Sequence, residues 1–212
     1  MADIFREVDE ELRREGLAKL ARRYGPAVIG VALAIILGIA GYTAWKHYAE
    51  RQQLERATAY FAALAEMGKN EAAAVQALQE LATGDDGYAA LAHLQAATLK
   101  AKSGETEDAI AIYRSLAANT GIEPAFRNLA TILLASHTVD TAPPEETAAM
   151  LEPLTGPADP WRFSALELLA LLAVRQDDTD RAVEIYQQLA DDLEAPPGLR
   201  ARATEMLAAL QG

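Results

Sequence analysis

Residues 107–117 read EDAIAIYRSLA, and residues 180–190 read DRAVEIYQQLA. Both stretches place an alanine, a tyrosine four residues later and a leucine three residues after that. The members are Ala109, Tyr113 and Leu116 in the first stretch and Ala182, Tyr186 and Leu189 in the second. Residues three and four apart lie on one face of an α-helix, so each stretch predicts a helix with one apolar face.

Two weaker copies accompany these stretches. Residues 145–155 read EETAAMLEPLT, and residues 55–65 read ERATAYFAALA. Lining up the four copies makes Ala57, Ala109, Thr147 and Ala182 equivalent, and the last three lie 38 and 35 residues apart. That spacing is close to the period of about 34 residues that is typical of tetratricopeptide repeats. The sequence therefore predicts a solenoid of helical hairpins, with an unspecific bundle of Ala- and Leu-rich helices as the alternative.

Small residues explain how the helices of one hairpin pack. An alanine in the second helix lets it approach the first helix closely, and the first helices carry a matching alanine at Ala97 and Ala170. The two tyrosines fill the gap to the next repeat. Gly104 makes the turn inside one hairpin, and Asp177 replaces it in the other.

The chain after residue 50 is rich in Ala, Leu, Glu and Gln, which favour helices, and no run alternates like a strand. Gly, Pro and Asp clusters interrupt it repeatedly, as at residues 68–70, 83–87 and 196–198. We expect an all-α fold with about nine helices after the apolar stretch described next. The first of these helices is expected to continue out of that stretch as far as Met67.

Residues 27–45 read AVIGVALAIILGIAGYTAW and contain no charged side chain. As a helix this stretch would be about 28 Å long, close to the hydrocarbon thickness of a bilayer. It predicts one N-terminal transmembrane helix, retained as a signal anchor. More Lys and Arg residues precede it than follow it closely, which favours a cytoplasmic N-terminus. We therefore expect a cytoplasmic amphipathic segment at 1–25, the anchor at 26–46 and a periplasmic repeat domain at 47–212 of a bacterial inner-membrane protein.

Two apolar faces near the N-terminus are candidate contact surfaces. Gly30, Ala34 and Gly38 recur every four residues and would form a smooth face against which another membrane helix can pack. The alternative is that this spacing has no role in packing, because Gly and Ala are common in membrane helices. Residues 4–12 place Ile4, Phe5, Val8 and Leu12 on one helical stripe, which suits either a helix lying on the membrane surface or a docking site for a cytoplasmic protein.

The net charge of −12 lies entirely after residue 45, where 13 basic residues meet 25 acidic ones. Such a domain repels nucleic acid, so no nucleic-acid partner is expected. There is no cysteine, which excludes disulfides and thiolate chemistry. The three histidines are far apart and have no second ligand at metal spacing, and the acidic residues 177–180 suit a helix N-terminus better than a calcium loop. We expect no catalytic residues, no cofactor and no metal.

The opening IFREVDEELRRE, the YGP before the apolar stretch and the degenerate repeats together resemble the tetratricopeptide-like family of the ancillary SecYEG translocon subunit, in its alphaproteobacterial form. The resemblance implies an inner-membrane scaffold that contacts translocon subunits, periplasmic chaperones and emerging secreted proteins. It implies no catalytic residues. The alternatives are a repeat scaffold for envelope assembly or cell division and a homo-oligomer assembled through the Gly30, Ala34 and Gly38 face.

Overall fold

The computed structural model describes the backbone of residues 2–212 and the side chains of Tyr24, Gly30, Val31 and residues 33–212. In this part of the chain it contains nine α-helices, one 3-10 helix and no strand, so the predicted all-α class is confirmed. The elements are α1 (Ala2–Glu66), α2 (Glu71–Leu81), α3 (Gly87–Lys102), α4 (Thr106–Ala118), α5 (Pro124–Thr138), α6 (Pro144–Leu151), η1 (Glu152–Leu154), α7 (Arg162–Arg175), α8 (Thr179–Asp191) and α9 (Pro197–Gln211). They form two compact units, residues 1–55 and 56–212.

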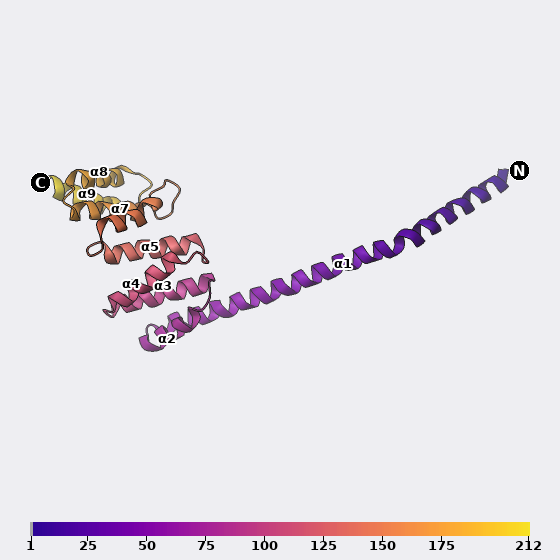
Figure 1. Ribbon diagram of the computed structural model, residues 1–212, viewed down its shortest axis with the longest axis horizontal. Helices are drawn as coiled ribbons and strands as arrows, with labels where there is room; N and C mark the ends of the chain where they lie inside the picture. Colours follow the sequence, from indigo (N-terminus) through magenta and orange to yellow (C-terminus); the bar gives the residue numbers. More distant parts are fainter. Residues whose placement is uncertain (1) are drawn as a thin grey trace. The chain divides into compact units, whose positions relative to one another are not determined.

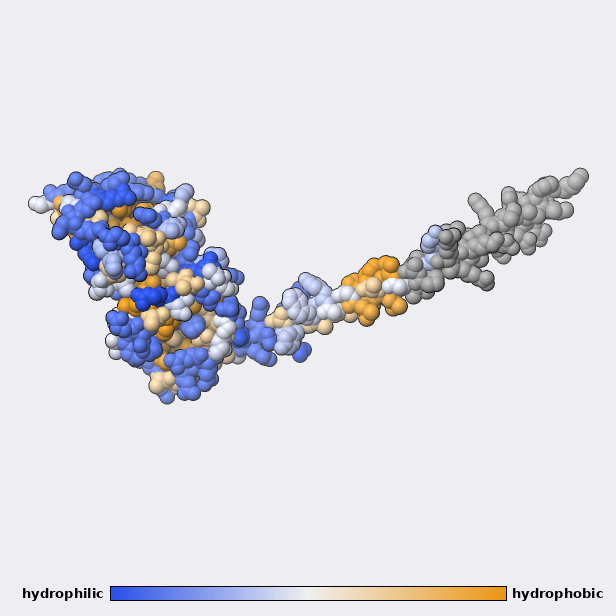
Figure 2. Space-filling model, in the orientation of Figure 1, coloured by the Kyte–Doolittle hydropathy of each residue, from blue (hydrophilic) through white to orange (hydrophobic). Residues whose placement is uncertain are grey.

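The first unit consists of helical residues of α1, and its described large apolar side chains are exposed. Ile35, Ile36 and Leu37 follow one another around the helix and are 56%, 60% and 70% exposed. Figure 2 shows a band of hydrophobic residues on the surface of α1. Within the part of the chain whose side chains are described, no helix offers an apolar stretch long enough to cross a membrane.

The transmembrane helix expected at 26–46 is therefore not found among the described residues. The side chains of residues 26–29 and 32, which belong to the expected anchor, lie outside that part. The side chains of the expected stripe of Ile4, Phe5, Val8 and Leu12 also lie outside the part of the chain whose side chains are described.

The second unit is a stack of helical hairpins. Helices α3 and α4, α5 and α6, and α7 and α8 form successive pairs, and α9 packs on the last pair. Figure 1 shows α2, α3, α5 and α7 stacked one after another in chain order, with α8 and α9 beyond α7. The order follows from the short connections, because a helix joined by a few residues has to return beside its predecessor.

Helix α3 is the first member of a pair and buries two faces. Ala90, Leu94 and Ala97 pack in a cluster with α4 and α5. Ala92, Ala96 and Leu99 pack in a second cluster with the end of α1 and with α2. A helix that is apolar on two faces is buried between neighbours, which is why α3 has no strongly one-sided pattern.

The same arrangement continues through α5 and α7. Helix α5 contributes Ala130 and Leu134 to the cluster with α3 and α4, and it contributes Ile132 and Ala135 to a cluster with α6, η1 and α7. Helix α7 then buries its other face against α8 and α9. Because each first helix joins two clusters, the unit is a solenoid in which every hairpin depends on its neighbour.

The turns inside two hairpins adopt the same backbone. Gly104 has a φ of 88° and Asp177 a φ of 57°, both in the left-handed region. In each turn two backbone N–H groups donate to carbonyls of the last helical turn. The bond that spans more residues runs from the Glu105 N–H to the Lys100 carbonyl at 2.9 Å in the first turn, and from the Asp178 N–H to the Ala173 carbonyl at 3.0 Å in the second. Both turns are therefore Schellman motifs. Asp177 takes the place of the glycine, as expected, although aspartate adopts the left-handed conformation less readily than glycine.

Candidate functional site

The residues predicted to pack the repeats lie in two buried clusters. One cluster contains Ala97, Ala109, Tyr113 and Leu116. The other contains Ala170, Ala182, Tyr186 and Leu189. None of these eight side chains is more than 4% exposed. Each alanine of the first helix therefore shares an interior with the alanine and the tyrosine of the second helix.

The middle copy keeps the same positions with different residues. Thr147 stands where the other copies have alanine and is fully buried, and its hydroxyl donates to the Pro143 carbonyl at 3.3 Å. Leu151 takes the tyrosine position at 0% exposure, and Leu154, in η1, takes the leucine position at 6%. A shorter side chain in place of tyrosine accompanies a shorter helix, since α6 spans only Pro144–Leu151.

The equivalence assigned to residues 55–65 is wrong. Phe61 would correspond to the two tyrosines, but it is 63% exposed, whereas Ala63 is buried. The stretch lies at the end of α1, where its buried side packs on α2 and α3 as the first helix of a pair. Alanine, aromatic and leucine residues recur in both kinds of helix, so their spacing did not distinguish them.

The two buried tyrosines differ in their hydrogen bonds. The hydroxyl of Tyr113 lies 3.2 Å from the hydroxyl of Thr98. The hydroxyl of Tyr186 is buried without a hydrogen-bond partner among the described residues. Leu171 occupies the position of Thr98 in this repeat and offers no hydroxyl. Burial raises the pKa of Tyr186, and the charge of Glu167 raises it further.

The face of Gly30, Ala34 and Gly38 is exposed on α1. A Cβ atom added at Gly30 or Gly38 would meet no atom within 4 Å. The described residues therefore place nothing against this face, and its role in helix packing stays a prediction.

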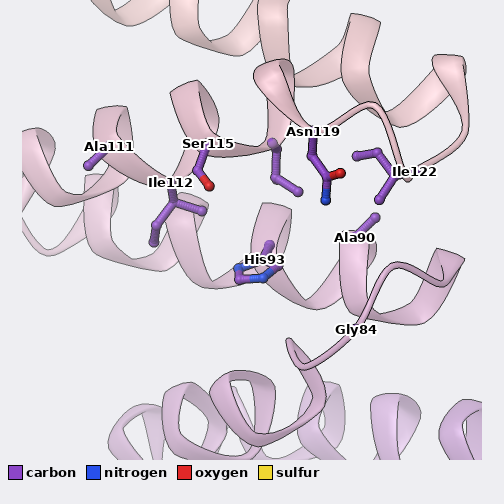
Figure 3. A pocket seen from close by; sticks show the side chains of 9 residues that line it. Gly84, Ala90, His93, Ala111, Ile112, Ser115, Asn119 and Ile122 are labelled. Carbon is purple, nitrogen blue, oxygen red and sulfur yellow. The ribbon is translucent and has the colours of Figure 1, made fainter.

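One pocket of about 260 Å³ lies between α3, α4 and the loops beside them. Its apolar lining includes Ile112, Leu116 and Ile122, and its polar groups are those of His93, Ser115 and Asn119. Figure 3 shows Ile112 and Ser115 of α4, and Asn119 directly after this helix, facing His93 and Ala90 of α3. The Asn119 amide is already engaged, because it donates to Asp85 at 2.9 Å and accepts from the Gly121 N–H at 2.8 Å. The pocket therefore offers an apolar cavity with few free polar groups.

Two further pockets lie at equivalent places in different repeats, and we name each by its first helix. The α3 groove, of about 450 Å³, is lined by Val75, Leu99, Lys100, Ser103 and Glu105 together with Glu71 and Ala72. The α7 groove, of about 210 Å³, includes the residues 73 positions later, Ala148, Leu172, Ala173, Gln176 and Asp178. Both grooves thus lie between the second helix of one hairpin and the first helix of the next.

The α3 groove contains a small ion-pair cluster. The Lys100 ammonium lies 2.6 Å from Glu105 Oε2 and 2.8 Å from Asp108 Oδ2. The hydrogen bonds to Asp108 and Glu105 raise the pKa of Lys100, and the same lysine holds the pKa values of both carboxyls below their usual range. Two carboxylates beside this groove are therefore paired with a lysine of the chain itself.

The described side chains contain no group of three or more His, Asp or Glu residues placed to hold a metal ion. The two tyrosine hydroxyls are buried, and no described nucleophile has a histidine beside it at hydrogen-bond distance. What the geometry offers is a set of apolar grooves with charged rims, which suits the recognition of side chains.

The chain belongs to the family of tetratricopeptide repeat-like domains, whose pattern matches residues 20–208. No curated protein matches the chain. The predicted tetratricopeptide-like repeat is thereby confirmed, and domains of this kind commonly bind proteins and act as scaffolds without enzymatic activity. The repeat pattern predicts a groove in the repeat domain but not the residues that line it, although comparing α3 with α7 at an offset of 73 residues marks the exchange of Lys100 for Ala173.

Proposed function

We propose that this protein is a membrane-anchored scaffold that binds other proteins beside the Sec translocon. The observation that carries the proposal is the stack of hairpins in residues 56–212, because stacked repeats present extended surfaces with grooves between neighbouring helices. The partners proposed are translocon subunits, periplasmic chaperones and secreted proteins as they emerge. The apolar lining of the grooves, beside charged groups that are paired with one another at Lys100, Glu105 and Asp108, supports binding over catalysis.

The proposed anchor is the uncharged stretch at residues 27–45. Its described Val, Ile and Leu side chains are all more than half exposed, and such a surface is costly in water unless lipid or another protein covers it. The preceding arginines and lysine, at residues 13, 14, 19, 22 and 23, favour a cytoplasmic N-terminus and a periplasmic repeat domain in the inner membrane. The acidic charge after residue 45 favours basic partners.

The translocon itself is proposed from the resemblance of residues 3–60 to the ancillary translocon subunit family. Photo-crosslinking in cells tests it, with a photoreactive amino acid at Gly38 in the anchor and at the exposed Gln187 on α8. Adducts to translocon subunits or periplasmic chaperones support the proposal. Adducts only to a second copy of the chain, or only to division and cell-wall proteins, contradict it.

A further inference from the structure

We propose that α6 and η1 form a hinge in the stack of helical hairpins, and that Arg175 is the latch that holds this hinge closed. The hinge divides the second unit into a first body, residues 56–138, and a second body, residues 162–211. The inference concerns the motion of the stack and does not depend on which partner the scaffold binds. It follows from the short middle helix, the small interior around it and the hydrogen bonds that span it.

The first observation is that α6 ends where the equivalent helices continue. Helices α4 and α8 have 13 residues each, whereas α6 has 8 and is followed by the 3-10 helix η1. Pro153 stands where α4 has Ser115 and α8 has Gln188. Proline has no N–H to donate and clashes with the preceding helical turn, so the α-helix ends before it. A 3-10 stretch inside a helix often marks a hinge, because its hydrogen bonds have poorer geometry than those of an α-helix.

The second observation is the small interior around α6. The cluster shared by α5, α6, η1 and α7 has six buried residues, against ten in each of the clusters on either side of it. Leu151 takes the place of a tyrosine, a residue type that buries about 150–250 Å². Thr147 brings a hydroxyl into this interior, and its hydrogen bond to the Pro143 carbonyl is long at 3.3 Å. Because each repeat of a solenoid contacts only its neighbours, the stack opens most readily at its weakest repeat.

The third observation is that one side chain ties the second body to the loop before α6. The Arg175 guanidinium, in the last turn of α7, donates to the Val139 carbonyl at 2.6 Å and to the Ala142 carbonyl at 2.7 Å. On the other side of α6, the bond from the Asn128 amide to the Asp159 carboxylate is 3.4 Å long. Arg175 therefore makes the shorter hydrogen bonds of these two connections, and removing it leaves α6 held chiefly by its short apolar face.

Motion at this hinge would change the α7 groove and leave the α3 groove intact. Ala148, Glu152 and Thr155 line the α7 groove from α6, from η1 and from the residue after η1, while Leu172 and Ile185 line it from the second body. The lining of the α3 groove lies entirely in the first body. Hinges absorb a motion in a few residues at the ends of elements, so the hinge makes one groove of the scaffold adjustable in width while the other keeps its shape.

Hydrogen–deuterium exchange of the full-length protein in detergent tests whether α6 opens. We expect the amides of residues 145–155 to exchange at least about 10-fold faster than those of the equivalent segments 107–118 and 180–191. Arg175→Ala should speed the exchange of residues 145–155 by a further factor of about 5–10, and Arg175→Lys by less, because an ammonium can still donate to a carbonyl. Arg202→Ala is the matched control. It removes an arginine that contacts Glu167 within the second body, and it should leave residues 145–155 unchanged.

Two results of this experiment would overturn the proposal. One is equal protection of the three segments, since α6 would then be as stable as α4 and α8. The other is an Arg175→Ala variant whose exchange rises by the same factor in all three segments, because a purely structural role of Arg175 predicts that result.

Distances between pairs of spin labels test whether the two bodies move. The chain has no cysteine, so each label goes to an introduced cysteine alone. Arg114→Cys with Gln187→Cys places exposed labels on α4 and α8, across the hinge, and Gln76→Cys with Arg114→Cys places both labels in the first body. We expect a broader distance distribution for the first pair, broadened further by Arg175→Ala, and no effect of Arg175→Ala on the second pair. Equal widths for the two pairs, unchanged by Arg175→Ala, would overturn the hinge even if α6 exchanges rapidly.

Discussion

Removing the hydroxyl groups of the two buried tyrosines should have opposite effects on stability. In Tyr113→Phe a real hydrogen bond is lost. Thr98 donates its own hydroxyl hydrogen to the Leu94 carbonyl at 2.9 Å, so the contact of 3.2 Å to Tyr113 has the tyrosine as donor. Thr98 keeps its bond to Leu94 when the partner is removed. We therefore expect Tyr113→Phe to lower the free energy of unfolding by about 1 kcal/mol.

In Tyr186→Phe no hydrogen bond is lost. The Tyr186 hydroxyl is buried without a partner among the described residues, and a buried unpaired polar group costs about 1–3 kcal/mol relative to its solvated state in the unfolded chain. The phenylalanine ring fills the same space, so packing is unchanged. Tyr186→Phe should raise the free energy of unfolding by about 1 kcal/mol, a difference of about 2 kcal/mol from its counterpart in the other repeat.

Thermal and urea unfolding of the full-length protein, followed by circular dichroism, measures both variants. A change of about 1 kcal/mol corresponds to about 2–4 °C in melting temperature for a chain of this size. A third variant checks the cause: Leu171→Thr supplies the residue that Thr98 provides in the first repeat. It should show a favourable coupling of about 1 kcal/mol with the Tyr186 hydroxyl in a double-mutant cycle against Tyr186→Phe. Equal destabilisation by Tyr113→Phe and Tyr186→Phe, or no coupling to Leu171→Thr, would refute the reasoning.

Three further predictions concern turns and charges. Asp177→Gly should stabilise the protein by about 0.5–1 kcal/mol in urea unfolding, because glycine adopts the left-handed φ of 57° without strain. Lys100→Met should make the free energy of unfolding less dependent on pH in the acidic range. The pKa values of Glu105 and Asp108 are lowered in the folded protein, because Lys100 stabilises both carboxylates. Their contribution to stability is therefore present above about pH 4 and is lost as the pH falls through the lowered pKa values. Arg175→Ala should lower the unfolding free energy by about 1–3 kcal/mol, with Arg175→Lys losing less, because the guanidinium donates to two carbonyls of the loop after α5 at 2.6 and 2.7 Å.

The course of the helices was predictable because local chemistry sets it. Proline starts α5, α6 and α9, and the break at residues 196–198 predicted the last of these starts. The turns at Gly104 and Asp177 could be matched from their equivalent places in the two repeats. Both hairpins require a residue with a left-handed backbone conformation at this position. The repeat family followed from the motif of residues 107–117 and 180–190, which depends on residues three and four apart and so on one helix at a time.

The assignment of residues 55–65 shows where local spacing was not enough. Their alanine, aromatic and leucine pattern fits a second helix, yet Phe61 is exposed and Ala63 is buried. Which face of a helix is buried depends on what stands beside it, and the end of α1 has α2 and α3 as neighbours. An apolar side chain on a helix indicates that something can cover it but not which element does.

By itself the sequence determined an all-α chain, the breaks between its helices and the repeat to which they belong, because turn chemistry and helical periodicity act over a few residues. Only the tertiary structure decided which side chains share an interior and which polar groups lack a partner. Lys100 and Asp108 meet across a turn, and the buried hydroxyl of Tyr186 has no hydrogen-bond partner among the described residues. These outcomes depend on distances between separate helices, which are set by the packing of the whole stack and by no single segment of it.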